Sequence, residues 1–186
     1  MKKLLLLISC FFLFTGAAYA DPVVEMKTSL GSIQIELNSE KAPLTVQNFL
    51  HYVDQKFYDG TIYHRVIGKF MIQGGGFDKY AKRKEPSAPI KNEATNGLKN
   101  LKGSIAMART GVVDSATSQF FINLVNNGSL DHRGTTARAF GYAVFGQVIA
   151  GMDVVEKIGS VKTIAKSSLF RNYPETQVII ESIRRL

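Results

Sequence analysis

Residues 63–76 read Tyr63-His64-Arg65-Val66-Ile67-Gly68-Lys69-Phe70-Met71-Ile72-Gln73-Gly74-Gly75-Gly76. They contain most of two short runs, 61–66 and 70–74, whose β-branched and aromatic side chains are typical of strands. Gly68 separates the two runs, as a break between strands should. Further strand-like runs bounded by Gly, Asn and Asp lie at 23–28, 33–37, 104–108, 119–124, 142–148 and 178–183. We therefore expect about eight short strands.

Only two segments show helical spacing. Pro43 stands at a favourable first helical position, and apolar residues recur on one face from there to Asp54. The second candidate is 152–158, which lies between Gly151 and Gly159. Short strands with two helices predict a mainly β fold, namely a closed eight-stranded antiparallel barrel with two helices covering its openings.

The first twenty residues have the layout of a cleaved secretory signal peptide. A positive start at 1–3 precedes the apolar run 4–14, and small residues at 18–20 form a cleavage site. Cleavage after Ala20 leaves 21–186 as one domain. The run is shorter than the ~20 apolar residues that span a bilayer, so we expect no integral membrane segment in the mature protein. The alternatives are an uncleaved N-terminal anchor and lipid attachment at Cys10.

Charge and cysteine content narrow the functional classes. The chain has 23 basic and 15 acidic residues, and removal of Lys2 and Lys3 with the signal peptide lowers the formal charge from +8 to +6. Cys10 is the only cysteine, so a disulfide framework and a cysteine-based zinc site are excluded. On an exported protein, basic charge favours acidic clients or envelope surfaces over nucleic acid, or simply keeps the surface soluble. We predict a periplasmic location.

Motifs of several other enzyme classes are absent from the sequence. It contains no complete GxGxxG or Walker pattern, no GxSxG and no HExxH, and its three histidines are scattered. The sequence therefore gives no basis for phosphate cradling, hydrolysis or metal catalysis, and we expect no cofactor and no metal. The sequon that begins at Asn127 is expected to mark only a turn.

Three motifs taken together resemble the cyclophilin family of peptidyl-prolyl cis/trans isomerases. They are HRV at 64–66, FMIQGG at 70–75 and SQFFI at 118–122, and the resemblance spans nearly the whole mature chain. It implies a monomeric enzyme that accelerates rotation about X-Pro bonds in unfolded or extended polypeptides and so assists the folding of exported proteins. Two alternatives are a proline-segment binding module or envelope chaperone with incidental turnover, and a surface adhesin that uses the barrel as a scaffold.

The chemistry of such a reaction agrees with the missing motifs. Peptide-bond rotation meets a resonance barrier of ~18–20 kcal/mol, and no bond is made or broken. A donor that reaches the proline nitrogen only in the twisted state lowers this barrier selectively. Arginine suits the task because it is always charged and donates from a rigid fork.

The resemblance also assigns the site. It implies a catalytic group of Arg65, Gln73 and Phe70, with Gln73 holding the arginine and the substrate. An apolar socket for the proline ring is expected from Phe70, Met71, Phe121 and Leu130. The remaining substrate contacts are expected from Ala108, Arg109, Gln119 and Tyr142, with the main chain of 107–109 binding substrate as an exposed strand edge does.

The chain departs from the usual family pattern at several positions. Ser129 stands where many eukaryotic cyclophilins have a tryptophan, so we predict weak cyclosporin binding. Tyr142 replaces a histidine, with an effect on rate that the sequence does not indicate. Arg109 replaces an asparagine, and its charge is expected to favour acidic residues beside the proline. The stretch 132–139 is longer and more basic than in eukaryotic members, and no function is assigned to it.

Overall fold

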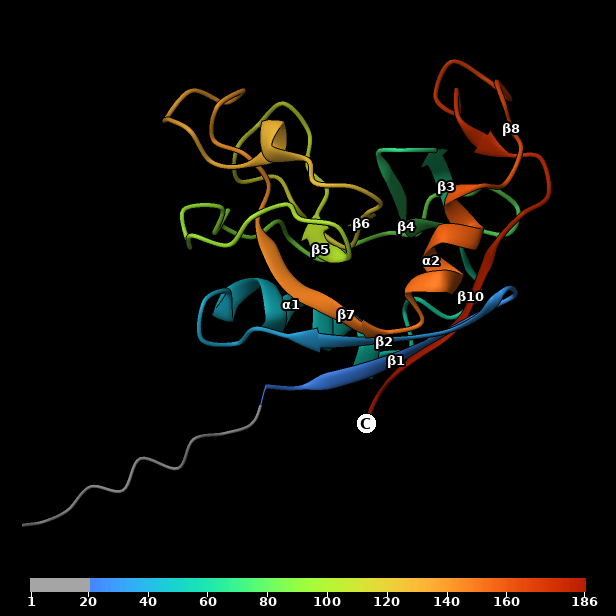
Figure 1. Ribbon diagram of the computed structural model, residues 1–186, viewed down its shortest axis with the longest axis horizontal. Helices are drawn as coiled ribbons and strands as arrows, with labels where there is room; N and C mark the ends of the chain where they lie inside the picture. The colour runs from blue at the N-terminus through green and yellow to red at the C-terminus, as the bar shows by residue number, and fades with distance from the viewer. Residues whose placement is uncertain (1–20) are drawn as a thin grey trace, which may run out of the picture.

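The computed structural model describes residues 21–186, so the predicted signal peptide lies outside the described residues. Eight antiparallel strands close into a barrel in the order β1-β10-β3-β4-β6-β5-β7-β2 (Figure 1). The barrel strands are β1 (Val23–Thr28), β2 (Gly31–Leu37), β3 (Thr61–Ile67), β4 (Met71–Asp78), β5 (Ser104–Met107), β6 (Phe120–Asn123), β7 (Val144–Ala150) and β10 (Ile179–Arg185). The predicted mainly β, eight-stranded barrel is confirmed.

Both predicted helices are present, as α1 (Pro43–Asp54) and α2 (Met152–Gly159). Sequence analysis missed a two-stranded sheet outside the barrel, formed by β8 (Thr163–Ile164) and β9 (Tyr173–Pro174), because two-residue strands show no periodic pattern. It also missed the short 3-10 helix η1 (Gly128–Leu130). No helix in residues 21–186 is long and apolar enough to cross a membrane.

One apolar cluster fills the barrel interior. Alternate residues of β2, Ile33, Ile35 and Leu37, are fully buried in it, as the strand period requires. Phe49 of α1 and Val155 of α2 belong to the same cluster. Because the hydrogen-bonded wall is closed, the helices can reach the interior only through its two open ends. They therefore cover the openings, as predicted.

A distant carboxylate caps the start of α1. Ala42 at the N-cap position makes no side-chain hydrogen bond. Instead the backbone amides of Leu44 and Thr45 donate to Glu93 Oε1 and Oε2 at 3.1 and 2.8 Å. Negative charge at this end also complements the helix dipole.

The glycine run after Gln73 differs from the prediction. The expected strand 70–74 begins at Met71 instead and continues through the glycines to Asp78, while Phe70 lies in the preceding turn. Gly75 has φ +80°, and a Cβ there would lie 2.9 Å from the rings of Phe120 and Tyr58. This position therefore accepts only glycine without distortion.

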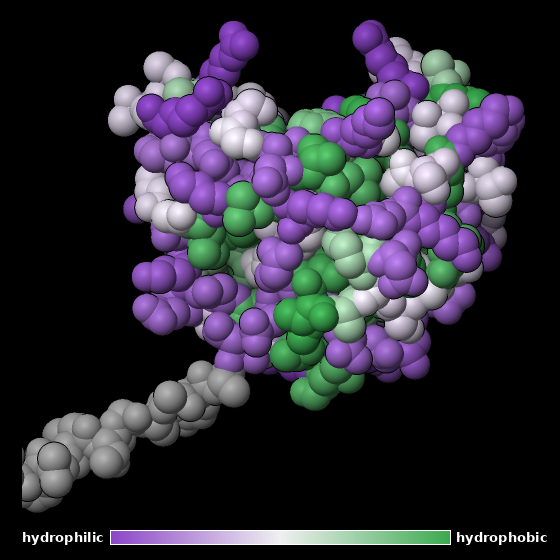
Figure 2. Space-filling model, viewed as in Figure 1, coloured by the Kyte–Doolittle hydropathy of each residue, from purple (hydrophilic) through white to green (hydrophobic). Residues whose placement is uncertain are grey.

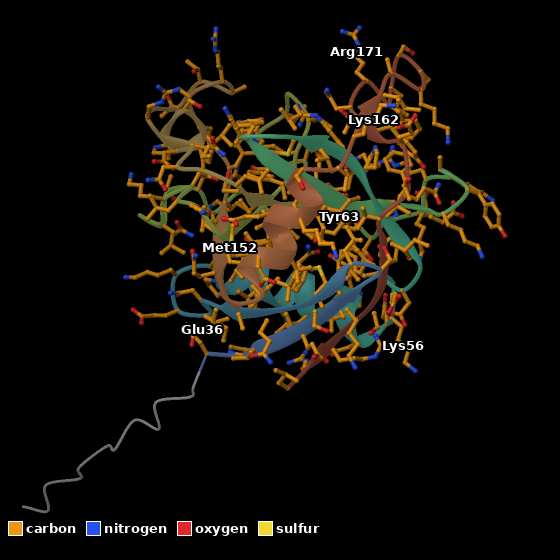
Figure 3. All side chains as sticks on the ribbon, turned by 45° about the vertical axis from the view of Figure 1, so that its right-hand side comes forward. Glu36, Lys56, Tyr63, Met152, Lys162 and Arg171 are labelled. Atoms are coloured by element: carbon orange, nitrogen blue, oxygen red, sulfur yellow. The ribbon has the colours of Figure 1, made fainter. Side chains whose placement is uncertain are left out.

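Two loops project from one end of the molecule. In Figure 1 they are the yellow-to-orange loop near residues 131–141 and the orange-red loop that carries β8. Figure 2 shows two hydrophilic projections at this end with a notch between them. Figure 3 places Arg171 on the second of these loops.

Candidate active site

An irregularity in β3 directs Arg65 to the outside of the barrel. Tyr63 is paired with Gly74 but Arg65 is paired with Gln73, so His64 is an extra residue that forms a β-bulge. Tyr63 and Val66 both belong to the interior cluster, and Figure 3 shows Tyr63 in the middle of the barrel. With strict alternation, Tyr63 and Arg65 would both point into the barrel. The extra residue His64 changes the alternation, so Arg65 points outward and Val66 inward.

The outer face of four strands forms an open cleft of about 170 Å³. Residues that alternate with the interior ones supply a separate apolar cluster there, with Met71, Ala106, Phe121 and Val144 as its buried members. The cleft is lined by Arg65, Phe70, Met71, Gln73, Ala108, Arg109, Phe121, Leu130 and Tyr142. The fold thus brings nine of the ten predicted site residues to one cavity.

The tenth predicted residue, Gln119, joins the cleft through a chain of hydrogen bonds. Arg65 Nη1 donates to Gln73 Oε1 at 3.1 Å, and Gln73 Nε2 donates to Gln119 Oε1 at 3.0 Å. Arginine can only donate, so the oxygen of Gln73 must face it and the direction of the chain is set. No hydrogen bond from the amide nitrogen of Gln119 occurs within residues 21–186.

Gly76 provides the space that Gln119 occupies. A Cβ at Gly76 would lie 2.5 Å from Gln119 Cγ and 2.7 Å from its Nε2. Any larger residue would displace the end of the hydrogen-bond chain. Gly76 therefore leaves room for Gln119 of the site, whereas Gly75 leaves room for the aromatic rings of the core.

Arg65 carries a positive charge without a carboxylate partner. Within residues 21–186 the hydrogen-bond acceptors of its side chain are Gln73 Oε1 and Met71 Sδ, the latter at 3.9 Å. By contrast, Arg184 and Arg185 each form an ion pair, with Asp59 and Asp54. Burial lowers the pKa of the Arg65 guanidinium, and nearby Tyr142 acts in the opposite direction, but arginine stays protonated in proteins. The cleft therefore offers an uncompensated donor beside an apolar floor.

The floor of the cleft is apolar and well ordered by packing. Met71 and Phe121 are 2% and 4% exposed. The ring of Phe121 meets that of Tyr142 edge to face, with centroids 5.6 Å apart. Two aromatic rings and a thioether beside a cation can hold a small aliphatic ring and present a donor to its edge.

His64, the neighbour of Arg65, packs away from the cleft. It is 6% exposed and its ring lies 4.7 Å from that of Phe77. Burial lowers the pKa of His64 to about 4, and the charge of Arg65 acts in the same direction. A neutral imidazole packed in an aromatic cluster has a structural role.

Part of the expected strand edge at 107–109 is used within the protein. The amide of Met107 donates to Ala143 O at 3.1 Å, and that of Ala108 donates to Gln119 O at 2.9 Å. Strand β5 ends at Met107, and Ala108 and Arg109 follow it and line the cleft. Binding of substrate to the main chain of 107–109 therefore stays a prediction, with the two amides of Met107 and Ala108 already used by the protein.

Asn127 is a positioning residue that sequence analysis missed. It is 8% exposed, and its Nδ2 donates to Phe70 O at 2.8 Å and to Asn123 Oδ1 at 2.7 Å. It thereby ties the turn that carries Phe70 to η1, which carries Leu130. The sequence signal was only an asparagine before a glycine, which is equally typical of a plain turn.

Residues that could hold a metal are not grouped in the described part of the chain. No cluster of three or more His, Cys, Asp or Glu side chains occurs within residues 21–186.

Comparisons with known proteins give a consistent match. The family described as "Cyclophilin type peptidyl-prolyl cis-trans isomerase/CLD" matches residues 23–185. A peptidyl-prolyl cis-trans isomerase of Acinetobacter baylyi is 54% identical over 92% of this chain and 89% of its own. Peptidyl-prolyl cis-trans isomerase B of Escherichia coli K12 is 51% identical over 87% and 98%.

Solved structures agree with these relatives. The crystal structure of a cyclophilin type isomerase from Cryptosporidium parvum has a TM-score of 0.73 and 25% identity, covering 89% of this chain and 98% of that one. A second structure of the same protein, in the presence of the dipeptide Ala-Pro, has a TM-score of 0.71 and 26% identity, covering 87% and 97%.

Proposed function

The chain belongs to the cyclophilin type peptidyl-prolyl cis-trans isomerase family and is a peptidyl-prolyl cis-trans isomerase, and we propose that Arg65 is its principal catalytic residue. The observation that carries this proposal is the uncompensated guanidinium beside an apolar floor. One of the Cryptosporidium structures is described as being in the presence of the dipeptide Ala-Pro, and we propose that this cleft takes such a proline-containing dipeptide.

In the proposed mechanism the proline ring lies on Met71 and Phe121. As the X-Pro bond twists, resonance is lost and the proline nitrogen becomes pyramidal with a free lone pair. Arg65 donates to that lone pair, which exists only near the transition state, so the interaction lowers the barrier without equally stabilising the bound substrate. A reduction of ~6 kcal/mol would accelerate rotation by a little over four decades.

Gln73 and Gln119 complete this arrangement. Gln73 accepts from Arg65 Nη1 and so helps to hold the guanidinium in place. Gln119 accepts from Gln73 and is thereby oriented, and we propose that its amide nitrogen donates to the carbonyl before the proline. No group in this chain needs to gain or lose a proton.

The test is catalysed exchange of a short Ala-Pro peptide, measured by NMR. We expect Arg65→Ala to lose about 10²–10³ of the catalysed rate, the usual cost of removing one preorganised donor. Arg184→Ala is the matched control, because it removes the same group from an ion pair outside the cleft. Exchange in Arg65→Ala at the wild-type level would assign the wrong role to Arg65, and slow exchange in the wild type would contradict catalysis of this substrate.

We further propose that residues 21–186 act in the periplasm on exported proteins, whose X-Pro bonds otherwise isomerise in tens to hundreds of seconds. The support is the signal-like pattern of residues 1–20. Asp21 already belongs to the fold, since its Oδ1 accepts from the amide of Ser39 at 3.0 Å. The mass of the protein in a periplasmic fraction should correspond to a start at Asp21, and full-length protein confined to the cytoplasm would refute export.

Two smaller proposals concern assembly and inhibition. We propose a monomer, which sedimentation of the mature protein would test, a dimer being the contrary result. The exposed Ser129 precedes Leu130 of the cleft and offers no ring to a large cyclic ligand. Cyclosporin should therefore inhibit weakly, and inhibition at nanomolar concentration would contradict this.

A further inference from the structure

The loop 131–141 connects two residues of the cleft. Leu130 precedes it and Tyr142 follows it, and the amide of Tyr142 donates to Leu130 O at 3.0 Å. Further along, the amide of Arg133 donates to Ala139 O at 2.8 Å. The loop is therefore closed at its base, and the geometry of that base sets the separation of two cleft walls.

Gly141 allows the two ends of the loop to meet. It has φ +82°, and a Cβ there would lie 2.6 Å from the His132 amide nitrogen and 2.8 Å from Leu130 O. A larger residue would push Leu130 and Tyr142 apart. The conformation and the close approach both require glycine.

The side chain of Arg109 fastens this loop from the side of β5. Its Nε donates to Gly141 O at 2.9 Å, its Nη2 to Ala137 O at 2.6 Å and its Nη1 to Thr110 O at 2.9 Å. Three of its five N–H donors are thus used by carbonyls, in directions that suit a rigid planar fork. A lysine has one nitrogen and could not bridge all three.

The same guanidinium covers the ring of Tyr142. Its central carbon lies 4.8 Å from the centroid of that ring, within the range of a cation–π contact. Tyr142 in turn meets Phe121 edge to face. A continuous set of contacts therefore runs from the loop through Arg109 and Tyr142 to the floor of the cleft.

We propose that Arg109 is a positioning residue that holds Tyr142 and the closed loop 131–141 as a fixed wall for the proline-containing substrate. This rests on the isomerase function proposed above and gives the long basic loop a role. The expectation that the charge of Arg109 favours acidic residues beside the proline stays a prediction, because the carbonyls that accept its hydrogen bonds carry no charge.

The role differs from that of Arg65. Arg65 acts on the twisted bond, whereas Arg109 shapes the wall in both the ground state and the transition state. Uniform binding of this kind changes substrate affinity more than the rate on the enzyme. Loss of Arg109 should therefore raise KM, and loss of Arg65 should lower kcat.

The experiment compares Arg109→Lys and Arg109→Ala with the control Arg138→Ala. Arg138 lies exposed on the same loop, and no side-chain hydrogen bond or ion pair of it occurs in the described chain. We expect both Arg109 variants to bind an Ala-Pro peptide roughly tenfold more weakly, a change of about 1.4 kcal/mol. The exchange rate of bound peptide should change less than about threefold. Arg138→Ala should match the wild type.

Arg109→Lys separates geometry from charge. If lysine restores wild-type affinity, charge alone is sufficient and the proposal is wrong. It is equally wrong if the NMR signals of the Tyr142 and Phe121 rings are unchanged in both Arg109 variants, because the wall has then not moved.

Gly141→Ala is a second variant that tests the same wall of the cleft. It should shift the same ring signals and weaken peptide binding, while signals of interior residues such as Tyr63 report an intact fold. Unchanged rings in this variant would overturn the role of the closed loop. The chemical shifts of the rings do not depend on turnover. If the wild type had no isomerase activity, the proposed function would be refuted, but the shifts would still test the role of Arg109.

Discussion

The interior of the barrel and the outer cleft are built from the same strands but by different rules. On β6, Phe120 points into the interior and Phe121 into the cleft, and on β4 Ile72 and Met71 divide in the same way. On β2 and β6 the interior residues alternate strictly with outward ones, and no Asp, Glu, Lys or Arg of residues 21–186 is buried. On β3 the bulge at His64 brings both Tyr63 and Val66 into the interior. The cleft needs a bulge to turn Arg65 outward, together with turns and a closed loop to complete its walls. Alternation thus accounts for the core residues of strands such as β2 and β6, whereas the cleft depends on the bulge, the turns and the closed loop.

The largest expected effect on stability distinguishes the two phenylalanines of β6. Phe120→Ala leaves a cavity in the closed interior and should lower the free energy of unfolding by about 3–5 kcal/mol. Phe121→Ala opens toward solvent and should cost about 2 kcal/mol or less, because water can fill the space. Urea unfolding of both variants measures this. Peptide binding should be lost in Phe121→Ala, and equal destabilisation by the two changes would erase the proposed distinction.

A change of pH should alter the stability of the protein through His64, without altering activity through its neighbour Arg65. His64 has a pKa of about 4 when folded against about 6.5 when unfolded, so the unfolded state binds the extra proton. The stability held by neutral His64 is complete above pH 6.5 and is lost as the pH falls toward 4, by about 3 kcal/mol in all. Denaturant unfolding across this range should show it.

His64→Gln is the matched control for that titration, since it keeps a polar side chain that does not ionise. The difference in unfolding free energy between wild type and variant should vary with pH only between about 4 and 6.5. The rate of the folded enzyme should stay flat there, because Arg65 and Gln73 do not titrate. A constant difference would show that His64 is not buried as described.

The smallest effect is expected at the exposed ion pair of Asp54 and Arg185. The hydrogen bond that Arg185 donates to Asp54 lowers the pKa of Asp54. Both side chains are, however, about half exposed. Asp54→Asn should cost less than about 1 kcal/mol and less still at high salt. Melting at two salt concentrations measures this, and a loss of several kcal/mol would show that an arginine far from the cleft matters as much as a core residue.

Sequence reasoning reached the interior from local patterns. The alternation of Ile33, Ile35 and Leu37 and the start of α1 at Pro43 are both visible in the chain and both hold. The capping of α1 by Glu93 was not predictable, because its partners lie 48 and 49 residues away. The same holds for the two-residue strands β8 and β9.

The members of the cleft were predicted by family resemblance rather than by periodicity. Nothing in the sequence around His64 shows that β3 contains an extra residue, so the outward direction of Arg65 needed the structure. Arg109 is held by backbone carbonyls, which every residue has, so these contacts leave no signal in the sequence. Such contacts depend on loop closure, which no short sequence pattern encodes.

The most direct test of the account separates binding from rotation at Arg65. With enzyme in excess over an Ala-Pro peptide, NMR gives both the dissociation constant and the cis/trans exchange rate of the bound peptide. For Arg65→Ala we predict that bound exchange slows by about 10²–10³ while the dissociation constant changes less than about threefold. If affinity falls by that much and bound exchange stays near the wild-type rate, Arg65 binds the substrate and does not act on the twisted bond.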